Sequence, residues 1–218
     1  SIAPHAEVWV LYGSTEVEPI AHIEAQEMFA LPSRSAEDAE WVEDGVNVGH
    51  PVSVLRIKFL QIHPGPIEVQ TESDWASLEV GTGEVGELIV AGEHVCRDYY
   101  NNPEAFCRAK IRDTDGTIWH RTGDLARLDD NGFLWMVGRV HNTIQRDGQY
   151  VFPIRAEMVL QKLPFVRQAA YLGLPDTKLK ERTVCVVALN TIERPQQRTE
   201  IERIMKKHDL PVDELHIV

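Results

Sequence analysis

The sequence predicts an α+β protein in which a small antiparallel β-barrel or β-sandwich is followed by a compact α+β unit. Short β-rich runs, separated by turns containing glycine and proline, fill much of the first part of the chain, and the pattern changes after Gly148 to helices and strands. The charge changes in the same region. Residues 1–149 hold 11 basic and 25 acidic residues, whereas residues 150–218 hold 11 and 9. We therefore expect a domain boundary near residues 140–150.

The first predicted element is the apolar run of residues 7–11, which leads into Tyr12-Gly13-Ser14 and is typical of a buried strand that enters a tight turn. Residues 24–50 predict a helix or loop around residues 36–42. Four further β-rich runs, whose spacing favours the barrel or sandwich, lie at residues 53–62, 87–91, 119–128 and 133–137.

The second unit is predicted by a different pattern. Residues 153–163 read as a helix with proline in its first turn, and residues 168–174 and 182–189 read as strands. A second helix is expected at residues 199–208, because Thr199 and Glu202 have the spacing of a capping box ahead of apolar residues.

Composition excludes several classes of function. The formal net charge of −12 repels a phosphate backbone, so no nucleic-acid or anionic-membrane partner is expected. No apolar run has the length needed to cross a bilayer. The three cysteines lack metal-binding spacing and indicate reduced thiols in a cytoplasmic protein. Because the chain starts at Ser1 and enters a strand almost at once, we expect it to be a piece of a longer protein.

A glycine motif at residues 81–86 matches GxGxxG. Dinucleotide binding needs a strand before this motif and a helix after it, but the following residues have a strand pattern. We interpret the motif as a turn.

The segment Tyr12-Gly13-Ser14-Thr15-Glu16 is the first candidate site. Hydroxyls, backbone N–H groups and one carboxylate at the end of a strand suit a phosphate with its magnesium ion. The alternative is a capped turn from a strand into a helix. The nine histidines include no metal-binding pair, and His120 is better explained as an ordinary residue of the β-rich region than as a ligand.

Asp124 and Arg139 form the second candidate site. Asp124 lies in Arg121-Thr122-Gly123-Asp124-Leu125 and has a carboxylate that suits a ribose diol, while Arg139 suits a sugar or phosphate. Each residue alone is also explained as a strand-end aspartate or a surface arginine.

Taken in order, these motifs resemble the adenylate-forming superfamily of acyl-CoA synthetases, luciferases and nonribosomal peptide adenylation domains. The resemblance spans almost the whole chain and is carried by residues 12–16, 86–92, 99–104, 120–125 and 132–139. It implies that residues 1–140 are the end of the large AMP-binding domain with its β-barrel lobe, and that residues 141–218 are most of a small, mobile C-terminal domain.

The resemblance also implies roles for single residues. Tyr12, with Gly13 and Ser14, would contact the adenine nucleotide, Thr15 would contact the phosphate, and Glu16 would bind Mg2+. Asp124 would hold the ribose hydroxyls with Arg139 beside them. The implied function is ATP-dependent activation of a carboxylic acid, favouring a fatty or apolar acyl chain, to an acyl adenylate. The implied acceptor is CoA, the thiol of an acyl carrier protein, or an intramolecular nucleophile.

Three features depart from the family pattern. The Gly/Ser/Thr-rich phosphate loop and the catalytic lysine are absent, so we expect the chain by itself to be inactive. A noncatalytic adenylate-binding or carrier-protein docking module is the alternative function. The hinge carries His141 and Gln145 where the family usually has an aspartate and a lysine. This altered hinge resembles the branch of the β-lactone synthetases of olefin biosynthesis, in which the acyl adenylate is captured intramolecularly.

Overall fold

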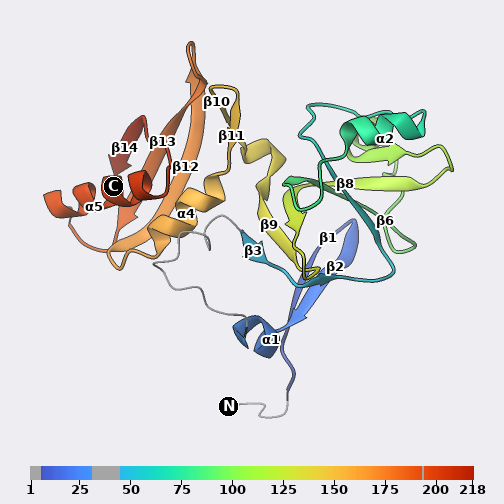
Figure 1. The fold of residues 1–218 in the computed structure, drawn as a ribbon, viewed down its shortest axis with the longest axis horizontal. Helices are drawn as coiled ribbons and strands as arrows, with labels where there is room; N and C mark the ends of the chain where they lie inside the picture. The colour runs from blue at the N-terminus through green and yellow to red at the C-terminus, as the bar shows by residue number, and fades with distance from the viewer. Residues whose placement is uncertain (1–5, 31–44, 193) are drawn as a thin grey trace. The chain divides into compact units, whose positions relative to one another are not determined.

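A computed structural model of the chain describes residues 6–30, 45–192 and 194–218 (Figure 1). The described residues form two compact units, one made of residues 6–30 and 46–140 and the other of residues 45, 141–192 and 194–218. The helix or loop expected around residues 36–42 lies outside the described residues. Within the described ranges, no helix is both long enough and apolar enough to span a bilayer.

The described helices and strands of the first unit are, in chain order, β1 (Trp9–Ser14), β2 (Val17–Glu24), α1 (Ala25–Ala30), β3 (Val46–Asn47), β4 (His50–Pro51), β5 (Arg56–Leu60), α2 (Glu72–Leu78), β6 (Gly86–Ala91), α3 (Pro103–Ala109), β7 (Lys110–Arg112), β8 (Ile118–Leu128) and β9 (Leu134–Arg139). The four β-rich runs predicted after residue 50 correspond to β5, β6, β8 and β9.

Two antiparallel sheets build this unit. The larger has the order β3-β9-β8-β6-β5, with β7 paired to β8, and the smaller has the order β1-β2-β4. Alternation along β6 places Leu88 in a core shared with Ile20 of β2, and places the next residue, Ile89, in a second core with Trp75 of α2. The large sheet therefore packs against the small sheet on one face and against α2 on the other.

The predicted α+β class is confirmed, but the β-barrel is not closed in the described part of the chain. Strands β3 and β5 are the two edges of the large sheet, and no described pairing joins them. Strand β3 has two residues, which provide too few backbone groups for the staggered pairing that closure requires.

The glycine motif at residues 81–86 is a turn, as predicted. Gly83 has φ of +79°, and β6 begins at Gly86. A Cβ atom at Gly86 would lie 2.8 Å from the carbonyl oxygen of Leu60. The glycine at this position allows the backbones of β5 and β6 to approach closely.

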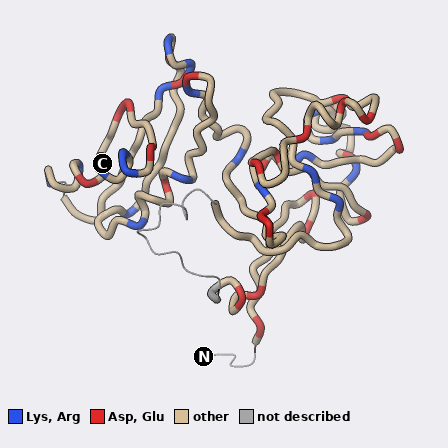
Figure 2. Tube along the Cα trace, viewed as in Figure 1, with Lys and Arg blue, Asp and Glu red and all other residues tan. Residues whose placement is uncertain are grey.

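The described helices and strands of the second unit are β10 (Ile144–Arg146), β11 (Gln149–Val151), α4 (Pro153–Gln161), β12 (Val166–Asp176), β13 (Lys180–Leu189), α5 (Pro195–Lys207) and β14 (Glu214–Ile217), after a short 3-10 helix, η2 (Val140–Asn142). The sheet has the order β11-β10-β13-β12, and β14 pairs with β13 in parallel. Lys178 lies in the turn between β12 and β13, and Lys180 is the first residue of β13. Figure 2 shows basic positions in blue where these two strands meet.

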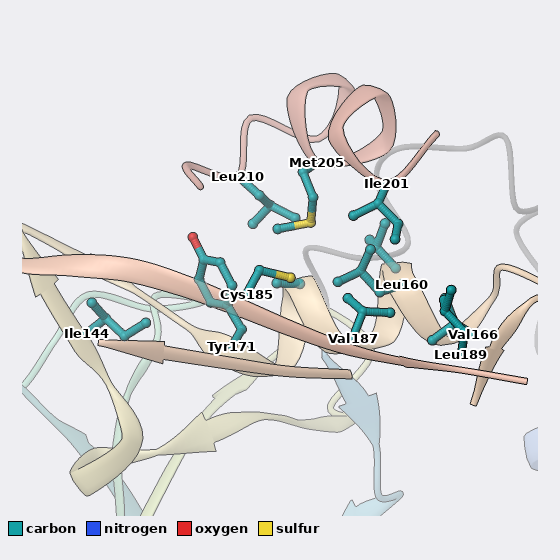
Figure 3. Close-up of a cluster of buried hydrophobic side chains, with 12 residues drawn as sticks. Ile144, Leu160, Val166, Tyr171, Cys185, Val187, Leu189, Ile201, Met205 and Leu210 are labelled. Carbon is teal, nitrogen blue, oxygen red and sulfur yellow. The ribbon is translucent and has the colours of Figure 1, made fainter. Parts of the chain in front are cut away.

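Helices α4 and α5 contribute to one core on the sheet of the second unit (Figure 3). Ile201 and Met205 of α5 point toward Tyr171 and Cys185 of the sheet, and Leu160 of α4 joins the same cluster. All five side chains are at most 1% exposed. Burial of apolar surface at this seam stabilises the unit.

The predicted start of α5 at Thr199 is wrong, because the helix begins four residues earlier at Pro195. Proline at the first helical position has a φ angle that suits the helix, and the side chain of Gln197 accepts a hydrogen bond of 2.8 Å from the N–H of Arg194. Thr199 instead donates its hydroxyl to the carbonyl of Pro195 within the helix.

Candidate nucleotide-binding site

The first candidate segment is the tip of a β-hairpin. Strand β1 continues through Ser14, and Thr15-Glu16 form a two-residue turn into β2. The alternative of a turn from a strand into a helix is therefore wrong. Gly13 lies at a register irregularity, where a Cβ atom would come within 2.7 Å of the carbonyl oxygen of Val17. The returning strand therefore leaves space only for glycine at this position.

The hairpin brings Tyr12 to Asp124, which is 112 residues away in sequence. The Tyr12 hydroxyl donates to Asp124 Oδ2 at 2.7 Å. Arg139 Nη1 lies 3.2 Å from Asp124 Oδ1, because β8 and β9 pair these two residues directly. Burial, followed by the charge of Asp124, raises the pKa of Tyr12. The phenol therefore remains a hydrogen-bond donor at neutral pH.

Thr122 holds the backbone on which Asp124 lies. Its hydroxyl donates to the carbonyl of Leu88 at 2.8 Å and accepts from the N–H of Asp124 at 3.0 Å. The intervening Gly123 has φ of +71°, which a residue with a side chain rarely adopts. The Thr-Gly-Asp sequence thus lies where the pairing of β8 with β6 is irregular, while Asp124 stays paired with Arg139 of β9.

Glu16 is held at both of its carboxylate oxygens. Tyr99 donates its hydroxyl to Oε1 at 3.0 Å, and Ser14 donates its hydroxyl to Oε2 at 3.1 Å. The Glu16 carbonyl accepts from the N–H of Cys96 at 2.7 Å. Burial acts to raise the pKa of Glu16, but the hydrogen bonds outweigh it and lower the pKa. Glu16 is therefore a carboxylate at neutral pH.

Lys110 and His120 are paired residues of β7 and β8, and both interact electrostatically with Glu16. Both are buried, with 2% and 4% of their surfaces exposed. The Lys110 ammonium donates to the Cys96 carbonyl and lies 5.2 Å from the centroid of the Tyr99 ring. Burial, followed by the charge of Lys110, lowers the pKa of His120 to about 4. His120 is thus neutral at pH 7 and accompanies a buried cation.

The hairpin interacts with β8 at two positions. The Tyr12 hydroxyl donates to Asp124, and Glu16, in the turn of the hairpin, interacts electrostatically with His120. The structure thus places a sugar-type acceptor and a metal-type carboxylate in the same unit.

The donor chemistry near Glu16 fits Mg2+. Mg2+ is usually held by one or two carboxylates together with the phosphates of its substrate, and it prefers oxygen ligands. Glu16 supplies a carboxylate and Ser14 a hydroxyl, and exposed Thr15 supplies a second hydroxyl at the tip. Elsewhere, the described residues hold no cluster of three or more His, Cys, Asp or Glu side chains that would bind a metal by themselves.

Among the site residues expected from the sequence, Tyr12 and Arg139 both contact Asp124, and Ser14 is hydrogen-bonded to Glu16. Sequence reasoning missed Tyr99 and Lys110. Tyr99 lies in one of the motifs that carry the family resemblance but received no role. A lysine at the start of a short strand gives no local signal that its side chain is buried.

Relatives of known function match most of the chain. An olefin β-lactone synthetase from Stenotrophomonas maltophilia is 31% identical over 189 residues, which are 84% of this chain and 32% of that protein. The long-chain fatty-acid–CoA ligase FadD13 of Mycobacterium tuberculosis is 33% identical over 113 residues, which are 52% of this chain and 22% of that protein. The chain belongs to the adenylate-forming superfamily. It spans about a third of the length of this synthetase.

Solved structures of adenylate-forming enzymes share the fold. The amide bond synthetase McbA from Marinactinospora thermotolerans matches with a TM-score of 0.70 and 23% identity, covering 95% of this chain and 37% of that chain. The o-succinylbenzoate CoA synthetase MenE from Bacillus subtilis, in complex with its acyl-adenylate intermediate, matches with a TM-score of 0.67 and 22% identity, covering 97% of this chain and 37% of that chain. No family model matches the chain.

Proposed function

We propose that the protein containing this chain uses ATP and Mg2+ to convert a carboxylic acid, with a fatty or apolar acyl chain, to an acyl adenylate. The observation that carries the proposal is the contact of Tyr12 and Arg139 with Asp124, together with the ordered carboxylate of Glu16 on the same hairpin. The names of the relatives, which include a long-chain fatty-acid ligase and a β-lactone synthetase, support this class of reaction.

Asp124 is the proposed acceptor for the ribose hydroxyls. A carboxylate has about four lone-pair positions, and Tyr12 and Arg139 occupy one on each oxygen, so capacity for a diol remains. The Tyr12 ring is proposed to lie against the adenine, with its hydroxyl anchored on Asp124. Arg139 holds the same carboxylate from the other side.

Thr15 is the proposed phosphate contact and Glu16 the proposed Mg2+ ligand. Bound Mg2+ would neutralise charge that develops on the phosphates. In the reaction, an oxygen of the substrate carboxylate bonds to the α-phosphorus of ATP while the bond from that phosphorus to pyrophosphate breaks. The residues described above take no proton in this step, and their contribution is to position the nucleotide.

In the second step, the acyl group passes from the adenylate to an acceptor. We propose that this acceptor is an intramolecular nucleophile or a carrier-protein thiol in preference to free CoA. His141 and Gln145 lack the charges that the family usually carries at the hinge. Gln145 Nε2 donates to the Tyr150 hydroxyl at 3.0 Å, and its Oε1 accepts from Lys180. The likeness to an olefin β-lactone synthetase supports this choice.

The three cysteines are free thiols, which supports a reducing, cytoplasmic compartment.

ATP–pyrophosphate exchange on the full-length protein tests the first step. We expect exchange that depends on a fatty acid, and none from residues 1–218 alone, since the phosphate loop and catalytic lysine are missing. Comparing exchange with CoA-dependent release of AMP tests the acceptor. CoA-dependent turnover as fast as adenylation would contradict the proposed acceptor, and absence of exchange with any carboxylic acid would contradict the proposed function.

A further inference from the structure

The Glu16 carboxylate depends on a side chain outside its own hairpin. Ser14, on the same hairpin, moves together with Glu16 and cannot fix the carboxylate relative to the rest of the unit. The Tyr99 hydroxyl, 83 residues away, donates to Oε1 at 3.0 Å.

Tyr99 is itself held by a buried cation. The Lys110 ammonium lies 5.2 Å from the centroid of the Tyr99 ring and donates to the carbonyl of Cys96. The N–H of Cys96 in turn donates to the carbonyl of Glu16. The segment from Cys96 to Tyr99 is thus hydrogen-bonded to Glu16 through the Cys96 backbone and the Tyr99 side chain. Lys110 contacts the same segment at the Cys96 carbonyl and the Tyr99 ring.

These contacts leave the Glu16 carboxylate able to bind a cation. The hydroxyls of Ser14 and Tyr99 take one position on each carboxylate oxygen, and each oxygen keeps a second lone-pair position. A carboxylate held in one orientation loses less conformational freedom when it binds a cation than a freely rotating carboxylate does.

We propose that Tyr99 is a positioning residue that orients the metal-binding carboxylate of Glu16, with Lys110 fixing the Tyr99 ring. This inference rests on the proposed role of Glu16 as the Mg2+ ligand. Tyr99 touches Glu16 and acts on the metal through that side chain. Lys110 acts one step further back, through the ring and the Cys96 carbonyl.

The test compares Tyr99→Phe with Tyr100→Phe in the full-length protein. The first change removes one hydroxyl and keeps the ring over Lys110. The second removes the same group from a neighbour that is 95% exposed. Binding of Mn2+ in the presence of ATP is measured by electron paramagnetic resonance, and the Mg2+ dependence of ATP–pyrophosphate exchange is measured in parallel.

We expect Tyr99→Phe to raise the Mn2+ dissociation constant about tenfold, the scale of one lost hydrogen bond to a charged group, and Tyr100→Phe to leave it unchanged. Glu16→Gln should raise it as well, and adding Tyr99→Phe to Glu16→Gln should cause no further change. Equal effects of Tyr99→Phe in the two backgrounds, or no effect in the native one, would overturn the proposal for Tyr99. An unchanged constant in Glu16→Gln would instead remove Glu16 from the metal site.

Discussion

Replacing Asp124 by alanine should weaken ATP binding about 30-fold in the full-length protein. The carboxylate is 14% exposed and is already bound by Tyr12 and Arg139, so it meets a ribose diol in a fixed orientation. Loss of a charged hydrogen-bond acceptor costs about 2 kcal/mol, which corresponds to a 30-fold change in the dissociation constant. The fold should survive, because the Arg139 side chain is 51% exposed and regains water.

The measurement is calorimetric titration with ATP and with 2′,3′-dideoxy-ATP, which lacks both hydroxyls. Asp124→Ala should weaken binding of ATP and leave binding of the dideoxy nucleotide nearly unchanged. Asp124→Asn, which keeps one oxygen acceptor without the charge, should give an intermediate loss for ATP. An equal loss for both nucleotides would refute the reasoning, because the aspartate would then act on the fold of the site and not on the diol.

Three further predictions concern stability and domain structure. Glu87→Gln should lower the free energy of unfolding in urea by about 3 kcal/mol, because it breaks the buried ion pair between Glu87 and Arg121. The Glu87 side chain is 2% exposed and the Arg121 side chain 8%. A loss below 1 kcal/mol would contradict this. The hydrogen bond from Arg146 lowers the pKa of Asp213 to about 2, from 3.8. The ionised Asp213 carboxylate thus contributes at most about 2 kcal/mol to the free energy of unfolding above pH 4, and this contribution is lost as the pH falls toward 2. In Asp213→Asn, the free energy of unfolding should therefore depend less steeply on pH between 4 and 2. Limited trypsin digestion should cut first within residues 139–148, where one compact unit gives way to the next; earlier cleavage among β5 to β9 would contradict a mobile hinge.

Local pattern predicted the elements whose signals lie within a few residues. Strand β6 was predicted by its own apolar residues, and the turn before it by the glycines at 81–86 together with the strand pattern that follows. Helix α4 was predicted from Pro153 and the apolar residues behind it. These signals are local because strand alternation, helix period and turn conformation depend on neighbouring residues.

The start of α5 shows where local reasoning failed. Thr199 and Glu202 have the spacing of a capping box, but Pro195 and Gln197 provide an earlier start, and packing of Ile201 and Met205 on the sheet stabilises the longer helix. Two local signals competed, and the helix followed the earlier one.

The candidate site divides in the same way. The sequence by itself determined which residue types are present at Tyr12, Glu16, Asp124 and Arg139, and their order supported a family. Only the tertiary structure decided that Tyr12 reaches Asp124 across 112 residues, and that Tyr99 holds Glu16 across 83. Contacts between segments so distant in sequence depend on how sheets pair and pack. The residues that neighbour each segment in sequence therefore do not predict these contacts.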